Sequence, residues 1–141
     1  MDLTKNIPRS PNERLLGIPM LPRTIDKARA ALAGSLGEYV YGDKSSFDTA
    51  LLSFLGISAA EFSEGVRTSP DDESMSRWVQ AHARDVTPSA VDEFVNNFLN
   101  DGDNDEERAR FAERRAKLPE SVRPKVTRWT DLLDVAEGRI N

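Results

Sequence analysis

The stretch from Thr87 to Phe98, TPSAVDEFVNNF, carries the most regular helical pattern in the sequence. Thr87 can cap a helix whose first-turn residue is Pro88, because proline suits a position where no amide donor is needed. The apolar residues that follow recur at the spacing of one helix face, and they are Val91, Phe94, Val95 and Phe98. The stretch therefore predicts an amphipathic helix with a buried apolar face.

Other stretches carry the same kind of signal, with a capping side chain or first-turn proline at the start and often a glycine at the end. Each also has apolar residues on one helix face. The expected helices cover residues 24–33, 45–55, 58–66, 69–82, 87–98, 101–117 and 127–137, and the second of them is opened by Ser45 or Ser46. Strand alternation is not convincing, so the sequence predicts an all-α fold, a compact orthogonal bundle of about six or seven short helices.

Residues 1–22 differ from the rest because they hold four of the eight prolines. Proline removes a backbone donor and disfavours helix in the residue before it, so we expect an extended N-terminal arm. Its apolar side chains indicate that the arm packs on the core, and Ser10-Pro11 could open a short helix up to Leu16. Because no internal linker follows, we expect a single helical domain over residues 1–141.

The residue types that the chain lacks exclude several classes of site. The chain has no cysteine and one histidine, His82. A disulfide scaffold, a thiolate nucleophile, an iron–sulfur cluster and a multi-histidine metal site are thereby excluded within one chain. The acidic run Asp101–Glu107 lacks the glycine and the closing carboxylate that a calcium loop needs. We therefore expect neither a metal site nor a cofactor.

The net charge and the apolar runs bear on partners and location. The net charge is −5 at pH 7, which disfavours nonspecific binding to nucleic acid or to an anionic membrane. The longest apolar run near the N-terminus, Leu15–Ile18, is too short for a signal peptide or a membrane span. Together with the absence of cysteine, this favours a cytoplasmic protein that does not bind membranes.

A strongly basic stretch lies within this acidic chain. Residues 108–128 hold eight basic and two acidic side chains, a net charge of +6, so the remainder carries −11. Such segregation can attract an acidic partner or a phosphate-bearing ligand. The other interpretation is helix-dipole matching and i,i+4 pairing, as in Glu106–Arg110 and Glu113–Lys117. The stretch lacks the aromatic and glycine interleaving typical of nucleic-acid modules, so nucleic-acid binding is the weaker hypothesis.

The first expected helix offers the best candidate for a ligand site. Its neighbours Arg23, Asp26 and Arg29 could line a polar pocket, since arginine binds carboxylate or phosphate as a two-pronged fork. Tyr39 and Tyr41 follow closely and could line the same pocket. The alternative is that these side chains bond the proline-rich arm and nearby backbone groups.

His82 and the two tryptophans complete the candidate set. Histidine exchanges protons near neutral pH, so His82 could act as acid or base beside a carboxylate. It also lies on the apolar face of its expected helix, one turn from Trp78, which is typical of a buried or boundary histidine with one hydrogen bond. A ligand pocket requires that Trp78, His82 and Trp129 converge with the polar residues of the first helix.

Several segments form a combination that is more specific than any single motif. They are Arg9-Ser10-Pro11, LPRTIDKARA at 21–30, LGEY at 36–39, LSFLGI at 52–57, Asp72-Glu73 with Trp78, and WTDLLDVAEGR at 129–139. Over nearly the whole chain they resemble a bacterial family, domain of unknown function 5069. Ala136 departs from the pattern, in which an acidic residue is expected. The resemblance implies a small helical, cytoplasmic domain and assigns no activity.

These observations favour a non-enzymatic helical domain that binds a partner protein or a small acidic ligand. The alternative is an enzyme acting on a phosphorylated or carboxylated metabolite, with His82 and a carboxylate as acid and base. Nucleic-acid binding through residues 108–128 is the second alternative. The oligomeric state stays open.

Overall fold

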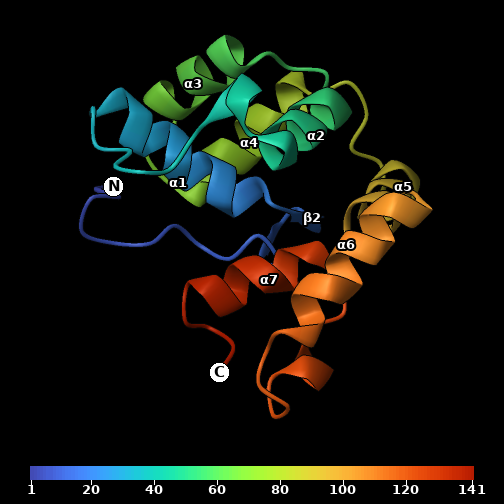
Figure 1. The fold of residues 1–141 in the computed structure, drawn as a ribbon. Coiled ribbons are helices and arrows are strands. Elements are labelled where there is room, and N and C mark those ends of the chain that lie inside the picture. Colours follow the sequence, from blue (N-terminus) through green and yellow to red (C-terminus); the bar gives the residue numbers. More distant parts are fainter. The chain divides into compact units, whose positions relative to one another are not determined.

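The chain folds mainly into helices, as a computed structural model that describes residues 1–141 shows (Figure 1). The seven α-helices are α1 Leu21–Leu32, α2 Ser46–Leu55, α3 Ala59–Thr68, α4 Asp72–His82, α5 Pro88–Phe98, α6 Asp105–Ala116 and α7 Trp129–Ala136. The remaining elements are β1 Arg14–Leu15, β2 Ile18–Pro19, and the 3-10 turns η1 Gly42–Lys44 and η2 Arg123–Lys125. The prediction of a mostly helical fold is confirmed, but the fold is not all-α, because it also contains a two-stranded sheet that was not expected. None of the helices is both long and apolar enough to pass through a bilayer.

The contacts within the chain divide it into two units, residues 1–94 and 95–141. The division falls within α5. The first unit contains the sheet and α1 to α4, and the second contains α6, η2 and α7. A single domain over the whole chain stays a prediction.

The first unit contains a hairpin at the place where a short helix was expected after Ser10. The strands β1 and β2 pair in antiparallel register. Leu16 and Gly17, which connect them, have φ angles of 57° and 75°. Two consecutive left-handed residues match the twist of the flanking strands, and this is the geometry of a tight hairpin turn. The expected helix up to Leu16 is therefore wrong, because the turn takes its place.

Helix α1 begins at Leu21, three residues before the expected cap Thr24. Met20 precedes the helix with a φ of 72°, and its backbone N–H donates to the carbonyl of Pro11 at 2.9 Å. Thr24 lies inside the helix, where its hydroxyl donates to Asp48 Oδ1 at 3.1 Å. A threonine hydroxyl can bond either a helix end or a distant partner, and the local sequence does not distinguish the two.

Most other helix starts in the first unit follow the local capping signals. The Ser45 hydroxyl caps α2 by accepting a backbone N–H at 3.2 Å. Ser58 and Glu61 form the expected capping box at the start of α3. Helix α4 differs, because its cap is Asp71 rather than Ser69. Both are capping residue types, and the structure uses the one nearer the helix.

Helices α1 and α3 pack against each other, and their buried side chains, including Ile25 and Phe62, form much of the core of the first unit. Helix α3 also packs on α4 at Gly65. A Cβ atom added to Gly65 would lie 2.4 Å from the Trp78 ring. The ring of Phe62 meets the same indole edge to face, with centroids 6.3 Å apart. The absence of a side chain at Gly65 therefore sets how closely α3 and α4 approach.

The second unit has a small apolar core of its own. It comprises Phe111, Val122 and Val126, with Leu118, Trp129, Leu132, Val135 and Ile140 packed against them. Helix α6 begins after Asn104, whose side chain accepts a backbone N–H of the first turn at 2.9 Å. The expected ion pairs Glu106–Arg110 and Glu113–Lys117 are present at 3.0 and 3.8 Å. These pairs confirm that part of the basic stretch is neutralised along its own helix.

Candidate functional site

The polar residues of α1 that the sequence singled out are largely buried. Arg23, Asp26 and the adjacent Lys27 are each 4% exposed. Buried charges are costly unless they are paired and hydrogen-bonded. The partners of these side chains therefore decide whether this face of α1 can serve a ligand.

Asp26 is held by Arg9, a residue of the N-terminal segment. Its Oδ2 accepts the backbone N–H of Arg9 at 2.9 Å and Nε at 3.1 Å, and its Oδ1 accepts Nη2 at 3.1 Å. Arg9 Nη1 also donates to Asp72 of α4 at 2.6 Å. Burial disfavours the charged form of Arg9, but the hydrogen bonds to Asp72 and Asp26 outweigh it and raise the pKa. Arg9 is thus a charged bridge from the N-terminal segment to α1 and α4.

This role of Arg9 could not be predicted from the sequence. Its two carboxylate partners, Asp26 and Asp72, lie 17 and 63 residues away along the chain. No helical or strand periodicity connects such positions. Within the sequence, Arg9 is distinguished only by its place beside Ser10-Pro11 in the family resemblance.

A second buried ion pair joins α1 to α2. Lys27 Nζ lies 2.8 Å from Asp48 Oδ1, with side-chain exposures of 5% and 0%. Asp48 Oδ1 also accepts the Thr24 hydroxyl at 3.1 Å, and Oδ2 accepts the backbone N–H of Gly42 at 2.9 Å. Both carboxylate oxygens of Asp48 are therefore used within the protein.

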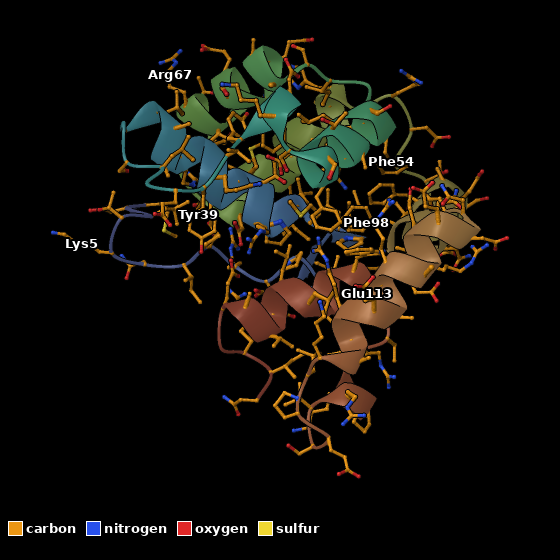
Figure 2. The ribbon with its side chains drawn as sticks, in the orientation of Figure 1. Lys5, Tyr39, Phe54, Arg67, Phe98 and Glu113 are labelled. Carbon is orange, nitrogen blue, oxygen red and sulfur yellow. The ribbon has the colours of Figure 1, made fainter.

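The two arginines of the predicted site bond to different parts of the first unit. Arg23 Nη1 donates to the carbonyl of Arg9 at 3.2 Å, and its guanidinium carbon lies 5.6 Å from the centre of the Tyr39 ring. Tyr39 is labelled in Figure 2. Arg29 Nη2 donates to the carbonyl of Ser69, at the end of α3, at 3.0 Å. These contacts favour the structural alternative, in which the arginines of α1 bond the arm and nearby backbone.

Tyr41 is also engaged within the first unit. Its hydroxyl donates to the carbonyl of Ala59 at 3.1 Å and lies 2.8 Å from the hydroxyl of Ser63. Burial raises the pKa of Tyr41 above its ordinary value. The tyrosine therefore ties the segment before η1 to α3.

His82 lies at the C-terminal end of α4 and is exposed to solvent. Its ring stacks on Trp78 with centroids 4.4 Å apart, and its Nδ1 lies 2.8 Å from the Trp78 carbonyl oxygen. Because a carbonyl oxygen only accepts, Nδ1 carries the proton. The expected buried or boundary position is wrong, because His82 is exposed, but the single hydrogen bond that was expected with it is present. No carboxylate bonds His82, so its position gives no support to acid–base chemistry.

Trp129 belongs to the second unit. Its Nε1 donates to the carbonyl of Asp101 at 2.9 Å, and its ring meets Phe111 with centroids 5.8 Å apart. The guanidinium carbon of Arg114 lies 5.2 Å from the centre of the indole ring. Trp129 therefore fixes the segment before α6 to α7, and its ring is contacted by Arg114.

A cleft of about 420 Å³ lies within the second unit. It is lined by Asp101, Arg108, Phe111, Ala112, Arg115, Ala116, Arg123, Val126 and Thr127. The residues from α6 recur at helical spacing and share one face of that helix. The opposite wall comes from η2 and the segment that follows it.

Two of the three arginines in the cleft are anchored but not neutralised. Arg115 Nε donates to the carbonyl of Val126 at 2.8 Å, and Arg123 Nε donates to the carbonyl of Leu118 at 3.1 Å. Their terminal Nη atoms bond no protein group. Arg108 is different, because it forms an ion pair with Asp105 at 2.6 Å. The cleft therefore contains two guanidinium groups that are fixed through their Nε atoms and whose Nη atoms can donate hydrogen bonds to a ligand.

The remaining polar groups of the cleft are acceptors. The Asp101 side chain makes no hydrogen bond within the protein. The Thr127 hydroxyl already donates to Asp131 Oδ2 at 3.3 Å, so its oxygen is left to accept. The sequence had marked the basic stretch that contains Arg115 and Arg123, but spacing alone could not separate anchored from paired arginines.

The fold and the cleft together define a mostly helical protein with an arginine-lined site. The family model described as "Domain of unknown function (DUF5069)" matches residues 5–139, almost the whole chain. The chain belongs to this family, as its motifs indicated. A search of the curated proteins found no match. Because the family description names no activity, a function has to be argued from the site.

Proposed function

We propose that this protein binds a small anionic molecule in the cleft between α6 and residues 123–127. The observation that carries the proposal is that Arg115 and Arg123 line one cleft with their Nε atoms bonded to backbone carbonyls and their Nη atoms unbonded. A guanidinium fork matches the oxygens of carboxylate and phosphate groups. Anchoring the Nε atoms in advance lowers the entropy lost when an anion binds.

The cleft is a better candidate than the polar face of α1. On α1, Asp26 bonds Arg9, Lys27 bonds Asp48 and Arg29 bonds a backbone carbonyl. An anion binding there would have to displace buried partners, at a cost of several kcal/mol. In the cleft, Arg115 and Arg123 need lose only water.

The electrostatics around the cleft favour a small ligand over nucleic acid. Residues 101–131 contain eight basic and eight acidic side chains, so the charge of +6 counted over 108–128 is balanced by its flanks. Four of the basic residues are ion-paired with carboxylates, namely Arg108, Arg110, Lys117 and Arg128. A nucleic-acid site needs a continuous row of unpaired cations along the phosphate backbone. A local anion site needs only the two held arginines.

The proposal is one of binding rather than catalysis. The cleft contains no histidine, and His82 lies in the first unit. We further propose that residues 1–20, the part of the expected arm that precedes α1, are a structural arm, which Arg9 fastens through Asp26 and Asp72. A cytoplasmic location accords with this function and stays a prediction.

Calorimetric titration of the full chain with inorganic phosphate and with citrate tests the proposal. We expect saturable binding at one site, and loss of that binding in the double variant Arg115→Gln/Arg123→Gln. The matched control is Arg110→Gln, which removes an arginine from the same helix outside the cleft. Absence of saturable binding in the wild-type protein, or equal losses in the control, would contradict the proposed function.

A further inference from the structure

The two anchored arginines set a limit on the class of anion that the cleft accepts. Arg115 and Arg123 each supply a positive charge and form no ion pair with a carboxylate. A phosphate monoester carries a charge of about −1.5 to −2 at neutral pH and three terminal oxygens. A single carboxylate and a phosphate diester each offer two charged or unesterified oxygens, one fewer than a monoester offers to the two guanidinium forks. Because Asp101 also lines the cleft and offsets part of its positive charge, the number of acceptor oxygens, rather than the charge balance, favours a terminal phosphate.

The other residues that line the cleft indicate the chemistry of the part of the ligand that carries the phosphate, which we call the ligand body. Apolar atoms come from four lining residues: Phe111, Ala112, Ala116 and Val126. The acceptors are the Asp101 carboxylate and the Thr127 oxygen, whose own proton is donated to Asp131. Acceptors in the cleft require donors on the ligand, and hydroxyl groups provide donors beside a carbon skeleton.

The volume of the cleft and the presence of Asp101 in its lining disfavour larger polyanions. The volume of about 420 Å³ is at the small end of the range for ligand pockets, which is about 300–1,000 Å³. Asp101 places a negative charge in the same cleft as the two arginines and repels a second phosphate. A ligand with one phosphate at one end and hydroxyl groups at the other satisfies both conditions.

We infer that the cleft takes a phosphate monoester of a small hydroxylated molecule, with Arg115 and Arg123 on the phosphate and Asp101 and Thr127 on the hydroxyl groups. This inference rests on the proposed function. In addition, it identifies the group that the two arginines bind as a phosphate, and it assigns to Asp101 the contact with the hydroxyl groups of the ligand.

Calorimetric titrations of the full chain with four probes test the inference. Glycerol 3-phosphate supplies a monoester with hydroxyl groups, inorganic phosphate lacks the body, dimethyl phosphate is a diester, and succinate is a dianion without phosphate. We expect the order glycerol 3-phosphate, then inorganic phosphate, then the other two. Because Arg115→Gln or Arg123→Gln removes hydrogen bonds to a charged group, we expect either variant to bind glycerol 3-phosphate about tenfold to a hundredfold more weakly.

Two further variants separate ligand contacts from loss of fold. Arg115→Lys keeps the charge but loses the fork and the bond to Val126, so it should weaken phosphate binding while circular dichroism stays unchanged. Asp101→Ala should leave inorganic phosphate binding equal or tighter and remove the advantage of glycerol 3-phosphate. Arg110→Gln should change neither affinity.

The outcomes distinguish this inference from the proposed function. If succinate or dimethyl phosphate binds as tightly as glycerol 3-phosphate, the monoester inference is wrong and small-anion binding stands. If Asp101→Ala weakens both phosphate probes equally, the assignment of Asp101 is wrong. If no probe binds, the proposed function fails as well. A single-stranded RNA that binds more tightly than every probe, with strong salt dependence, would overturn both in favour of a nucleic-acid site.

Discussion

Replacing Arg9 by alanine removes the bridge that fastens the N-terminal segment to α1 and α4. The side chain of Asp26 is 6% exposed, so the substitution leaves a buried carboxylate without its cation. Removing one partner of a buried ion pair costs about 3–5 kcal/mol. The Arg9–Asp72 contact adds little, because the Asp72 side chain is 44% exposed and water screens it.

Two features place the expected loss at the lower end of that range. The backbone N–H of residue 9 still donates to Asp26 Oδ2 in the variant, and the Arg9 side chain is already 30% exposed in the wild-type protein. We expect the free energy of unfolding to fall by about 3 kcal/mol. Urea denaturation measures it, and a slope of about 1–3 kcal/mol per molar makes the shift of the midpoint at least about 1 M.

Matched variants show whether the loss comes from the buried charge. Arg67→Ala breaks an exposed pair with Glu64 on α3 and should leave the urea midpoint unchanged. Arg9→Ala/Asp26→Asn removes both charges and should recover part of the stability lost in the single variant. A loss below about 1 kcal/mol for Arg9→Ala, or a double variant no more stable than the single one, would refute this reasoning.

Other contacts in the first unit give further expected outcomes. Gly65→Ala forces a Cβ against the Trp78 ring, so we expect about 1–3 kcal/mol of destabilisation in a thermal melt with altered tryptophan fluorescence. Lys27→Met leaves Asp48 buried without its cation and should cost about 3–5 kcal/mol by urea denaturation. The backbone N–H that Asp71 caps lowers its pKa from 3.8, so its contribution to stability is present at neutral pH and is lost as the pH falls through the folded value. Acid unfolding of Asp71→Ala should lack that component.

Local chemistry in the sequence predicted the helices better than the segments between them. The starts at Ser45, Ser58 and Thr87 depend on a capping side chain within one turn, and the structure uses all three. The hairpin was missed because it depends on left-handed backbone at Leu16, a conformation that leucine rarely adopts. The start of α1 was misplaced because the Thr24 hydroxyl bonds Asp48 on another helix.

The candidate site was predicted only as far as composition allows. The sequence identified the basic stretch as unusual, and Arg115 and Arg123 lie in it. Which arginines stay unpaired depends on backbone carbonyls reached through the fold, at Val126 and Leu118. The α1 residues were singled out because many of them are charged. The structure shows that Arg9, which lies 17 residues before Asp26, pairs with Asp26 inside the protein, so this charge is not available to a ligand.

Nitrogen-15 NMR of the arginine Nε–Hε groups during titration with glycerol 3-phosphate tests the central claim most directly. We predict saturable shifts at Arg115 and Arg123, with a smaller shift at the backbone amide of Thr127, which follows the carbonyl that Arg115 bonds. The signals of Arg23 and Arg29 should stay where they are. Shifts at these α1 arginines with none at Arg115 and Arg123 would contradict the claim that the cleft is the anion site.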